Sequence, residues 1–446
     1  MKKVLVLGSG FVSRPMVNYL FKHNYNVIVA SNLLDKAEEL VKDNLNGKAI
    51  YFDISKDENK LGELLQDVDL VVSILPYIFH VKVAKACIKY KKNMVTTSYV
   101  SNEMKSLDQE AKQAGIIILN EMGADPGIDH MSAMRIIDAV KRKGGKISKF
   151  KSYCGGLPAP EANTNPFGYK FSWSPRGVVL SGKDPALYLD NGQKISIPEG
   201  MLFKKSNLDK LTVEEDDLGE FEVYANRDSL KYIDLYGIPE TKTMFRGTLR
   251  NVGWCDTWDK ISALGFLELG DRSDLKGLTY KQALSKLINT EGKNIKREVA
   301  DKLKISTDHP VMQRMNWLNL FSDQLIPDSI EKITPLDILT EKLEQSLQYE
   351  DGERDMLILI HDFLVEYPNG GKEKISSTMI DYGDPNGDSS MSRTVSLPAA
   401  IASRLILTET IKIKGVVIPT SPEIYIPVLE ELETYGIVCK EETTSL

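Results

Sequence analysis

MKKVLVLGSGFVSRPMVNYLFKHNYNVIVA, residues 1–30, sets the fold of the N-terminal part of the chain. Val4–Leu7 is an uncharged apolar run, as expected of a strand buried on both faces of a parallel sheet. The turn Gly8–Ser13 follows, then an amphipathic stretch and a second apolar strand, Val27–Ala30. This order is typical of a dinucleotide-binding βαβ unit, in which the turn and the helix N-terminus bind a pyrophosphate.

The turn departs at one position from the usual G-x-G-x-x-G fingerprint. Ser13 stands in place of the third glycine, and a residue this small still lets the helix pack closely on the strand. A glycine motif alone is weak evidence, but its place directly after the first strand supports it. We therefore predict that Ser9, Gly10, Phe11 and Val12 contact a dinucleotide.

The composition is that of an ordinary globular protein, and 446 residues exceed the size of one core, so we expect two or three domains. The net charge of −7, without a basic run, argues against a nucleic-acid surface, and no apolar run is long enough to span a bilayer. The four cysteines are scattered, with no C-x-x-C pair and no histidine at zinc-ligand spacing, so we expect reduced thiols and no metal site. The first strand begins too near Met1 for a signal peptide, so we expect a cytoplasmic protein.

Strands and helices alternate as far as Asn120. Apolar strand-like runs occur at 49–53, 69–76, 94–98 and 116–119, with amphipathic stretches between them. This alternation predicts an α/β fold with a doubly wound parallel sheet, whose ligand binds beyond the carboxyl ends of the strands. The residues at these ends are Gly10, Phe11, Val12, Ala30, Ser31, Asn32, Asp53, Ile54, Leu75, Pro76, Thr97, Ser98 and Tyr99.

The end of the second strand bears on the choice between the two nicotinamide cofactors. An acidic residue there binds the ribose 2′-hydroxyl of NAD, and an arginine nearby receives the 2′-phosphate of NADP. This chain has neither, but Ser31 and Asn32 can bond to a phosphate and Lys36 can add a positive charge. We predict NADP, and NAD stays open.

Beyond Asn120 the pattern changes. Glu121–His130 leaves a strand, turns and enters a helix, and Asp125 precedes a proline, which keeps its backbone out of the helical region and lets its carboxylate face a cleft. The stretches 152–160 and 165–174 are dense in glycine, proline and aromatic residues, as in irregular loops that carry function.

Several short runs, spread over nearly the whole chain, carry a family resemblance. They are Gly8–Val12, Ile74–Tyr77, Val95–Tyr99, Gly123–His130, Tyr153–Glu161, Tyr169–Ser174, Asn226–Ser229, Arg246–Arg250, Gln348–Asp351 and Glu353–Met356. With these runs in this order, the chain resembles the saccharopine dehydrogenases of the L-glutamate-forming kind, also called saccharopine reductases. It departs from the family pattern in lacking an arginine after the second strand and in having Ala124 where leucine is usual.

The resemblance implies a Rossmann domain at 1–122, with a segment from about 395 to 446 packed back on it. It implies a substrate and dimerisation domain with a large mixed sheet at 123–275 and 350–394, and a helical insertion at 276–349. The implied reaction is a reversible NADP-dependent interconversion of saccharopine with L-glutamate and 2-aminoadipate 6-semialdehyde, in lysine biosynthesis or breakdown. The family and the apolar stretch Val416–Pro419 also indicate a homodimer.

The resemblance also assigns residues to the site. Ser98 and Tyr99 match positions shared between nicotinamide and substrate. Further matched positions are cofactor contacts at Ala124, Asp125, Pro126 and Ser174, and substrate contacts at Asp125, Arg227, Thr248, Leu249 and Arg250. Asp125, Tyr99 and Cys154 can each hold or relay a proton, and the sequence does not choose among them.

Two other functions stay open at this point. A related Rossmann reductase that joins an aldehyde to a different amine, as carboxynorspermidine-type dehydrogenases do, would share the glycine turn. Such an enzyme would not need two arginines for the three carboxylates of saccharopine. A non-catalytic dinucleotide-binding protein would not need Asp125, Cys154 or Tyr99.

Overall fold

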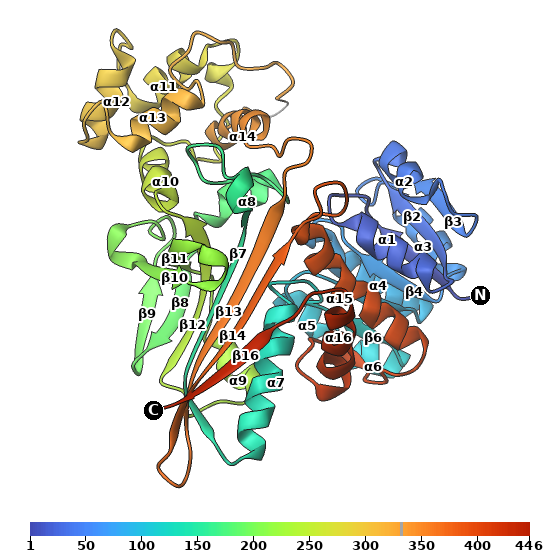
Figure 1. The fold of residues 1–446 in the computed structure, drawn as a ribbon. Coiled ribbons are helices and arrows are strands. Elements are labelled where there is room, and N and C mark those ends of the chain that lie inside the picture. Colours follow the sequence, from blue (N-terminus) through green and yellow to red (C-terminus); the bar gives the residue numbers. More distant parts are fainter. Residues whose placement is uncertain (331–332) are drawn as a thin grey trace. The chain divides into compact units, whose positions relative to one another are not determined.

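The computed structural model describes residues 1–330 and 333–446. The chain divides into two compact units (Figure 1). Unit 1 consists of Met1–Ser148, Leu235–Glu240 and Met356–Leu446, and unit 2 of Lys149–Asp234 and Thr241–Asp355. The three-part domain boundaries expected from the sequence stay a prediction.

A seven-stranded parallel sheet forms the core of unit 1, in the order β15-β6-β5-β4-β1-β2-β3. The apolar run Val4–Leu7 is fully buried in β1, an interior strand of this sheet. The predicted doubly wound parallel sheet is therefore confirmed. Its strands are β1 (Lys3–Leu7), β2 (Asn26–Ser31), β3 (Gly47–Tyr51), β4 (Leu70–Ser73), β5 (Asn93–Thr96), β6 (Ile117–Leu119) and β15 (Gly415–Val417).

Strand β15 comes from the C-terminal part of the chain and pairs with β6, more than 290 residues earlier. It uses Val416 and Val417, the apolar stretch that the sequence analysis associated with dimerisation. This stretch is therefore accounted for within the chain, and the dimer prediction rests on the family resemblance.

Helices connect and cover the strands of unit 1. In α1, Met16, Val17 and Leu20 are fully buried, which is the apolar stripe predicted from the spacing. Helix α15 packs on α1, and α16 packs on α7 and α15. The helices are α1 (Ser13–Lys22), α2 (Leu34–Val41), α3 (Glu58–Gln66), α4 (His80–Tyr90), α5 (Asn102–Ser106), α6 (Asp108–Ala114), α7 (Ile128–Arg142), α15 (Ser390–Leu407) and α16 (Pro422–Thr434). Among the described residues, no helix has both the length and the apolar character needed to cross a membrane.

Unit 1 also contains an antiparallel layer. Strands β13 (Asp355–Glu366) and β14 (Lys372–Tyr382) form a long hairpin, and β16 (Lys440–Ser445) pairs with β14. His361 of β13 lies with its Nε2 2.8 Å from the hydroxyl of Ser132 on α7, and both residues are fully buried. Helix α7 is therefore held between elements of unit 1 along most of its length.

Unit 2 is built on a mixed sheet, as expected. Strand β12 runs parallel to β7 and antiparallel to β11 and β8, and β10 and β9 extend the two sides. The strands are β7 (Lys146–Pro158), β8 (Ala186–Asp190), β9 (Gln193–Ile197), β10 (Leu208–Val213), β11 (Gly219–Ala225) and β12 (Thr243–Asn251).

The helical insertion follows this sheet in unit 2, and Figure 1 shows α11, α12 and α13 as one cluster. Helix α11 begins with a capping box, in which Thr279 and Gln282 bond each other's backbone N–H groups. The predicted insertion is confirmed. The helices of unit 2 are α8 (Pro175–Ser181), α9 (Lys231–Tyr236, which ends in unit 1), α10 (Trp254–Ala263), α11 (Tyr280–Ile288), α12 (Ile295–Leu303), α13 (Pro310–Trp317) and α14 (Pro335–Ser346).

Candidate active site

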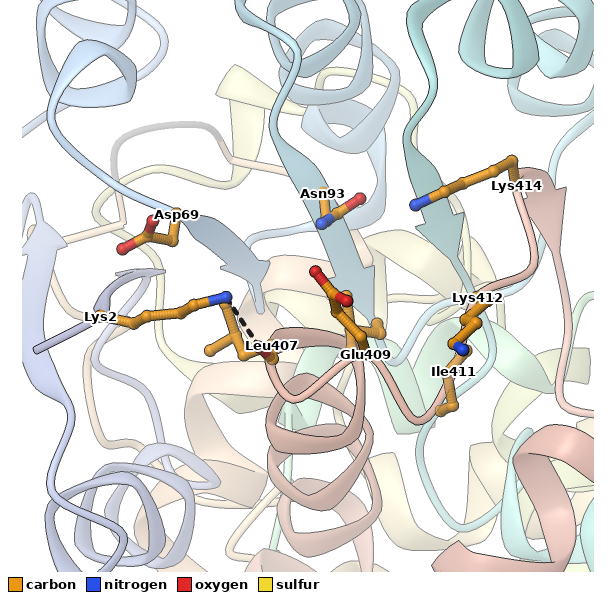
Figure 2. Close-up of a pocket in the computed structure, with 9 residues that line it drawn as sticks. Lys2, Asp69, Asn93, Leu407, Glu409, Ile411, Lys412 and Lys414 are labelled. Carbon is orange, nitrogen blue, oxygen red and sulfur yellow. Dashed lines mark hydrogen bonds between the residues drawn. The ribbon is translucent and has the colours of Figure 1, made fainter.

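A polar hollow in unit 1 lies away from the carboxyl ends of the strands (Figure 2). Lys2 precedes β1, Asp69 precedes β4 and Asn93 begins β5, so the hollow is at the amino ends of the parallel strands. Lys2 Nζ donates to the Leu407 carbonyl at 2.7 Å. Since ligands of doubly wound folds bind at the opposite edge, this hollow is not the cofactor site.

The glycine turn after β1 has the geometry of a phosphate-binding turn. Gly8 has φ +112°, and a Cβ there would lie 3.2 Å from the Ile74 carbonyl oxygen, so only glycine fits. A Cβ on Gly10 would meet nothing within 4 Å, so the space above the turn is open. Helix α1 begins at Ser13 with no side-chain cap and no acidic residue in its first turn. Its N–H groups and positive dipole end therefore suit a pyrophosphate.

The end of β2 is held to this turn by two serines. The Ser9 hydroxyl lies 2.8 Å from that of Ser31, which also accepts a hydrogen bond from Leu33 N at 3.0 Å. Ser31 is therefore a buried part of the turn, whereas Asn32 and Lys36 are exposed. Lys36 Nζ lies 5.7 Å from the centre of the Phe11 ring, so its charge reaches back to the glycine turn.

The next strand ends position the remaining unit 1 candidates. Asp53, after β3, accepts hydrogen bonds from the hydroxyl and amide of Ser55, which keep the pKa of Asp53 below its ordinary value. Its carboxylate thus shapes its own loop. The neighbouring Ile54 is buried in the core, while Leu75 and Thr97 are half-buried at the strand ends.

A buried histidine fixes Ser98. His80 lies with Nδ1 3.0 Å from the Ser73 hydroxyl and Nε2 2.8 Å from the Ser98 hydroxyl. Burial lowers the pKa of His80 from 6.5 to about 4, so the ring is neutral at pH 7. The sequence analysis missed this role, because a histidine at a helix start has no signal for contacts with two separate strand ends.

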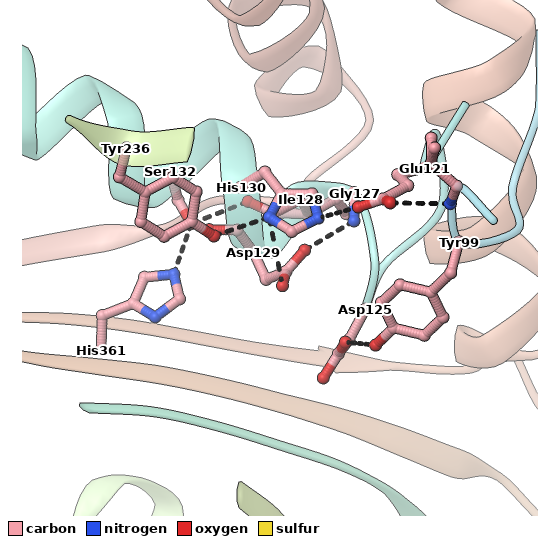
Figure 3. A network of polar contacts seen from close by, with 11 residues as sticks. Tyr99, Glu121, Asp125, Gly127, Ile128, Asp129, His130, Ser132, Tyr236 and His361 are labelled. Atoms are coloured by element: carbon pink, nitrogen blue, oxygen red, sulfur yellow. Dashed lines mark hydrogen bonds and ion pairs between the residues drawn. The ribbon is translucent and has the colours of Figure 1, made fainter. Parts of the chain in front are cut away.

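Tyr99 and Asp125 are brought together (Figure 3). The Tyr99 hydroxyl donates to Asp125 Oδ1 at 2.7 Å. Asp125 is half-buried while Ala124 and Pro126 beside it are buried, so the carboxylate is the accessible group of this turn. The Asp125–Pro126 peptide bond is cis. Asp125 does not occupy the N-cap of the next helix, since α7 follows Gly127.

In unit 2, the candidates gather on one face of the mixed sheet. Side chains alternate along a strand, so Arg246, Thr248 and Arg250 of β12 share a face and the buried Leu249 points to the other. Cys154 of β7 is the register partner of Thr248 and therefore lies on the same face. The sequence predicted these residues but not that the two strands are neighbours.

Arg250 is enclosed by aromatic rings. It is only 4% exposed, and its guanidinium carbon lies 5.0 Å from the ring centre of Tyr169, 5.8 Å from Tyr224 and 5.5 Å from Trp254. Burial raises the pKa of both tyrosines, so their rings stay neutral. One Nη donates to the Leu249 carbonyl at 2.8 Å.

The buried charge of Arg250 has no carboxylate partner in the part of the chain that the structure describes. The Nε atom of Arg250 is buried and has no hydrogen-bond partner either. A buried cation in this state is unfavourable unless an anion joins it. The cage around Arg250 is therefore suited to an anionic ligand.

The other unit 2 candidates differ from Arg250. Arg227 has φ +53°, an exposed side chain, and an ion pair from its Nε to Asp184 at 3.3 Å. Arg246 is buried, with its guanidinium 4.5 Å from the Tyr232 ring centre. Ser174 caps α8 by accepting a hydrogen bond from Gly177 N at 3.3 Å.

Comparisons with known proteins agree with this geometry. The family model "Saccharopine dehydrogenase NADP binding domain" matches residues 4–119, and "Saccharopine dehydrogenase C-terminal domain" matches residues 123–437. The Saccharomyces cerevisiae protein named saccharopine dehydrogenase [NADP(+), L-glutamate-forming] is 40% identical over 458 residues, covering 100% of both chains. The solved apo structure of saccharopine dehydrogenase (L-Glu forming) from the same yeast matches all of both chains with a TM-score of 0.88.

The Bos taurus protein named alpha-aminoadipic semialdehyde synthase is 39% identical over 99% of this chain. The chain spans about half of that protein's length, 48%. The resemblance inferred from the sequence and NADP as the cofactor are confirmed. The chain belongs to the saccharopine dehydrogenase family.

Proposed function

We propose that the chain catalyses the reversible NADP-dependent interconversion of saccharopine with L-glutamate and 2-aminoadipate 6-semialdehyde. In the oxidising direction, the carbon beside the secondary amine would give a hydride to NADP⁺ and the nitrogen would give up its proton, so the amine becomes an imine. Water then adds to the imine, and the C–N bond breaks to give the two products. The observation that carries the proposal is the buried aromatic cage of Arg250, which suits an anionic group such as a substrate carboxylate. This cage lies in a chain that matches the yeast saccharopine dehydrogenase over the whole of both sequences.

The residues around the glycine turn fit NADP. The backbone of Ser9–Val12 and the N-terminus of α1 would hold the pyrophosphate, and Asn32 and Lys36 would face the 2′-phosphate. When bound, the nicotinamide supplies the hydride acceptor or donor. Lys36 replaces the arginine usual in the family with a weaker point charge, so we propose only a modest preference for NADP over NAD.

The substrate's carboxylates would bind on the β12 face. Arg250 is the principal partner, because a desolvated guanidinium gains most from a carboxylate. Thr248 shares its face, and Arg227 would bind a second carboxylate from an exposed turn.

The hydrogen bond from Tyr99 to Asp125 is the support for assigning proton transfer to this pair. In this pair the phenol hydroxyl would exchange a proton with the substrate nitrogen, and the carboxylate would accept the phenol's proton or return it. Cys154, on the sheet face with Thr248, is the third candidate.

The test is NADPH absorbance after saccharopine is added to the enzyme with NADP, with L-glutamate measured as product. The reverse reaction consumes NADPH when glutamate and the semialdehyde are added together. A chain that accepted a different aldehyde and amine, or that bound NADP without turnover, would contradict the proposal.

We further propose a homodimer and a cytoplasmic location. Sedimentation at micromolar concentration checks the first, and a strict monomer would contradict it. Cell fractionation checks the second.

A further inference from the structure

Glu121 occupies a junction between two loops of unit 1. Its backbone is left-handed (φ +60°), a conformation that non-glycine residues rarely adopt. Its side chain is buried, and both carboxylate oxygens are used: Oε1 accepts from Val100 N at 2.9 Å, and Oε2 lies 2.7 Å from His130 Nε2. The Glu121 backbone N–H donates to the Ser98 carbonyl at 3.1 Å. Glu121 thus ties the loop that carries Tyr99 to the first turn of α7.

His130 continues the connection, as Figure 3 shows. Its side chain is fully buried. Because a carboxylate only accepts, Nε2 carries a hydrogen and donates it to Glu121. The other ring nitrogen, Nδ1, lies 2.6 Å from the Tyr236 hydroxyl and 3.6 Å from Asp129 Oδ2. The ring is thereby held on both sides.

Asp129 extends the network to the turn on which Asp125 sits. Its Oδ1 accepts from Gly127 N at 2.6 Å, and its backbone N–H donates to the Ala124 carbonyl at 3.0 Å. A Cβ on Gly127 would lie 1.9 Å from the Gly123 carbonyl oxygen, so the turn closes tightly on itself. The turn has little freedom once Asp129 is in place.

We propose that Glu121 and His130 are positioning residues that hold the Tyr99–Asp125 pair in its reactive arrangement. This inference rests on the proposed function, in which Tyr99 and Asp125 carry out the proton transfer. The Tyr99 side of the pair is fixed through Val100 and Glu121, and the Asp125 side through the first turn of α7. Since a misplacement of about 1 Å at a reacting group can lower a rate about a hundredfold, the network contributes to kcat without touching the substrate.

The variant Glu121→Gln tests the proposal. An amide offers one acceptor oxygen where the carboxylate offers two, so the hydrogen bond from Val100 N and the one from His130 Nε2–H cannot both be kept in their present form. We expect kcat for saccharopine to fall roughly tenfold to a hundredfold, while the dissociation constant of NADP changes less than about twofold. Ser132→Ala is the matched control, because it removes a buried hydrogen bond from the same helix without touching Glu121 or His130, and it should keep the wild-type kcat.

A double variant separates positioning from a general structural loss. If Glu121 acts through Tyr99, the kcat of Tyr99→Phe with Glu121→Gln should match that of Tyr99→Phe alone, because the second substitution then acts on a hydroxyl that is already missing. If the fold-loss in kcat of the double variant equals the two single-variant losses multiplied together, the two residues act independently and the proposal is wrong. A wild-type kcat in Glu121→Gln would also contradict the proposal. If Glu121→Gln does not fold, Tyr236→Phe, which removes one hydroxyl, takes its place with a smaller expected loss.

Hydrogen exchange of the apo protein tests the network without the reaction. Because Glu121→Gln and Tyr236→Phe weaken the tie between the Tyr99 loop and α7, the loop should open more often and the Val100 amide should exchange about tenfold faster in both variants, but at the wild-type rate in Ser132→Ala. Unchanged exchange in the first two variants would overturn the inference. A wild-type chain that binds NADP but does not turn over saccharopine would instead overturn the proposed function, and exchange would still decide whether the network holds this loop.

Discussion

Arg250 and Arg227 carry the same charge in unit 2 and meet opposite environments. Arg250 is 4% exposed among three aromatic rings, with no carboxylate at ion-pair distance in the described chain. The Arg227 side chain is 55% exposed and pairs with Asp184. Water and Asp184 already stabilise the charge of Arg227 in the ligand-free protein, whereas the buried charge of Arg250 gains its stabilisation when an anion binds. Burial therefore decides how much each arginine contributes to binding, although the sequence treats them alike.

The largest expected effect follows from removing the buried charge. Arg250→Ala should lower kcat/KM for saccharopine at least about 30-fold, since losing one partner of a desolvated charge pair costs roughly 2–5 kcal/mol. Steady-state kinetics measure the loss, and NADP affinity measured by fluorescence should hardly change. Near-normal kcat/KM would remove Arg250 from the substrate site.

Arg250→Lys is the matched control for the cage. It keeps the charge but loses the planar group that lies against the rings, so activity should stay roughly tenfold below wild type. Full rescue by lysine would mean that charge alone matters there.

The second prediction concerns His80, a buried group whose charge depends on pH, as a further comparison with the exposed Arg227. Unfolded His80 binds a proton below pH 6.5, but the folded protein binds it only near pH 4. The contribution of His80 to the free energy of unfolding is therefore constant above about pH 7. It falls by up to about 1.4 kcal/mol per pH unit between pH 6.5 and 4, and it levels off below pH 4. In urea unfolding, the curves of wild type and His80→Gln should converge as the pH drops from 7 to 4. Parallel curves would contradict a neutral buried ring.

Removing the exposed arginine should matter less. Exposed ion pairs contribute about 0.2–1 kcal/mol, so Arg227→Ala should lower kcat/KM by no more than about fivefold. The control Asp184→Asn removes the carboxylate charge that pairs with Arg227 and should leave kcat/KM near wild type. If Arg227→Ala matched Arg250→Ala, then Arg227 would become desolvated in the substrate complex and the contrast between the two would fail.

The smallest effect concerns another exposed cation. Lys36→Ala should reduce the ratio of kcat/KM values for NADP and NAD by about threefold, because an exposed charge near a phosphate is screened by water. Lys42→Ala, on an exposed lysine just past α2 that pairs with Glu39, is the control and should leave the ratio unchanged. An unchanged ratio in Lys36→Ala would exclude Lys36 from the 2′-phosphate site.

Local patterns were sufficient for the parallel sheet and for the strand ends that carry cofactor candidates. Val4–Leu7 and Gly8–Ser13 are adjacent in sequence, so their periodicity and turn chemistry report the βαβ unit directly. The same patterns showed the apolar stretch Val416–Pro419 but not its pairing with β6, since a strand of three residues has no periodicity that points to a partner hundreds of positions away.

The site divides in the same way. Motif runs identified Tyr99, Asp125, Cys154 and Arg250, because each lies in a short stretch typical of the family. Their environments depend on contacts between distant segments: Tyr169 and Tyr224 around Arg250, and His80 beneath Ser98. The exposure and the pKa of a side chain depend on the residues that folding packs around it, and many of these residues are far away in the sequence. The sequence therefore identified which residues belong to the site, but only the fold decided how buried each one is and how strongly it can bind an anion or hold a proton.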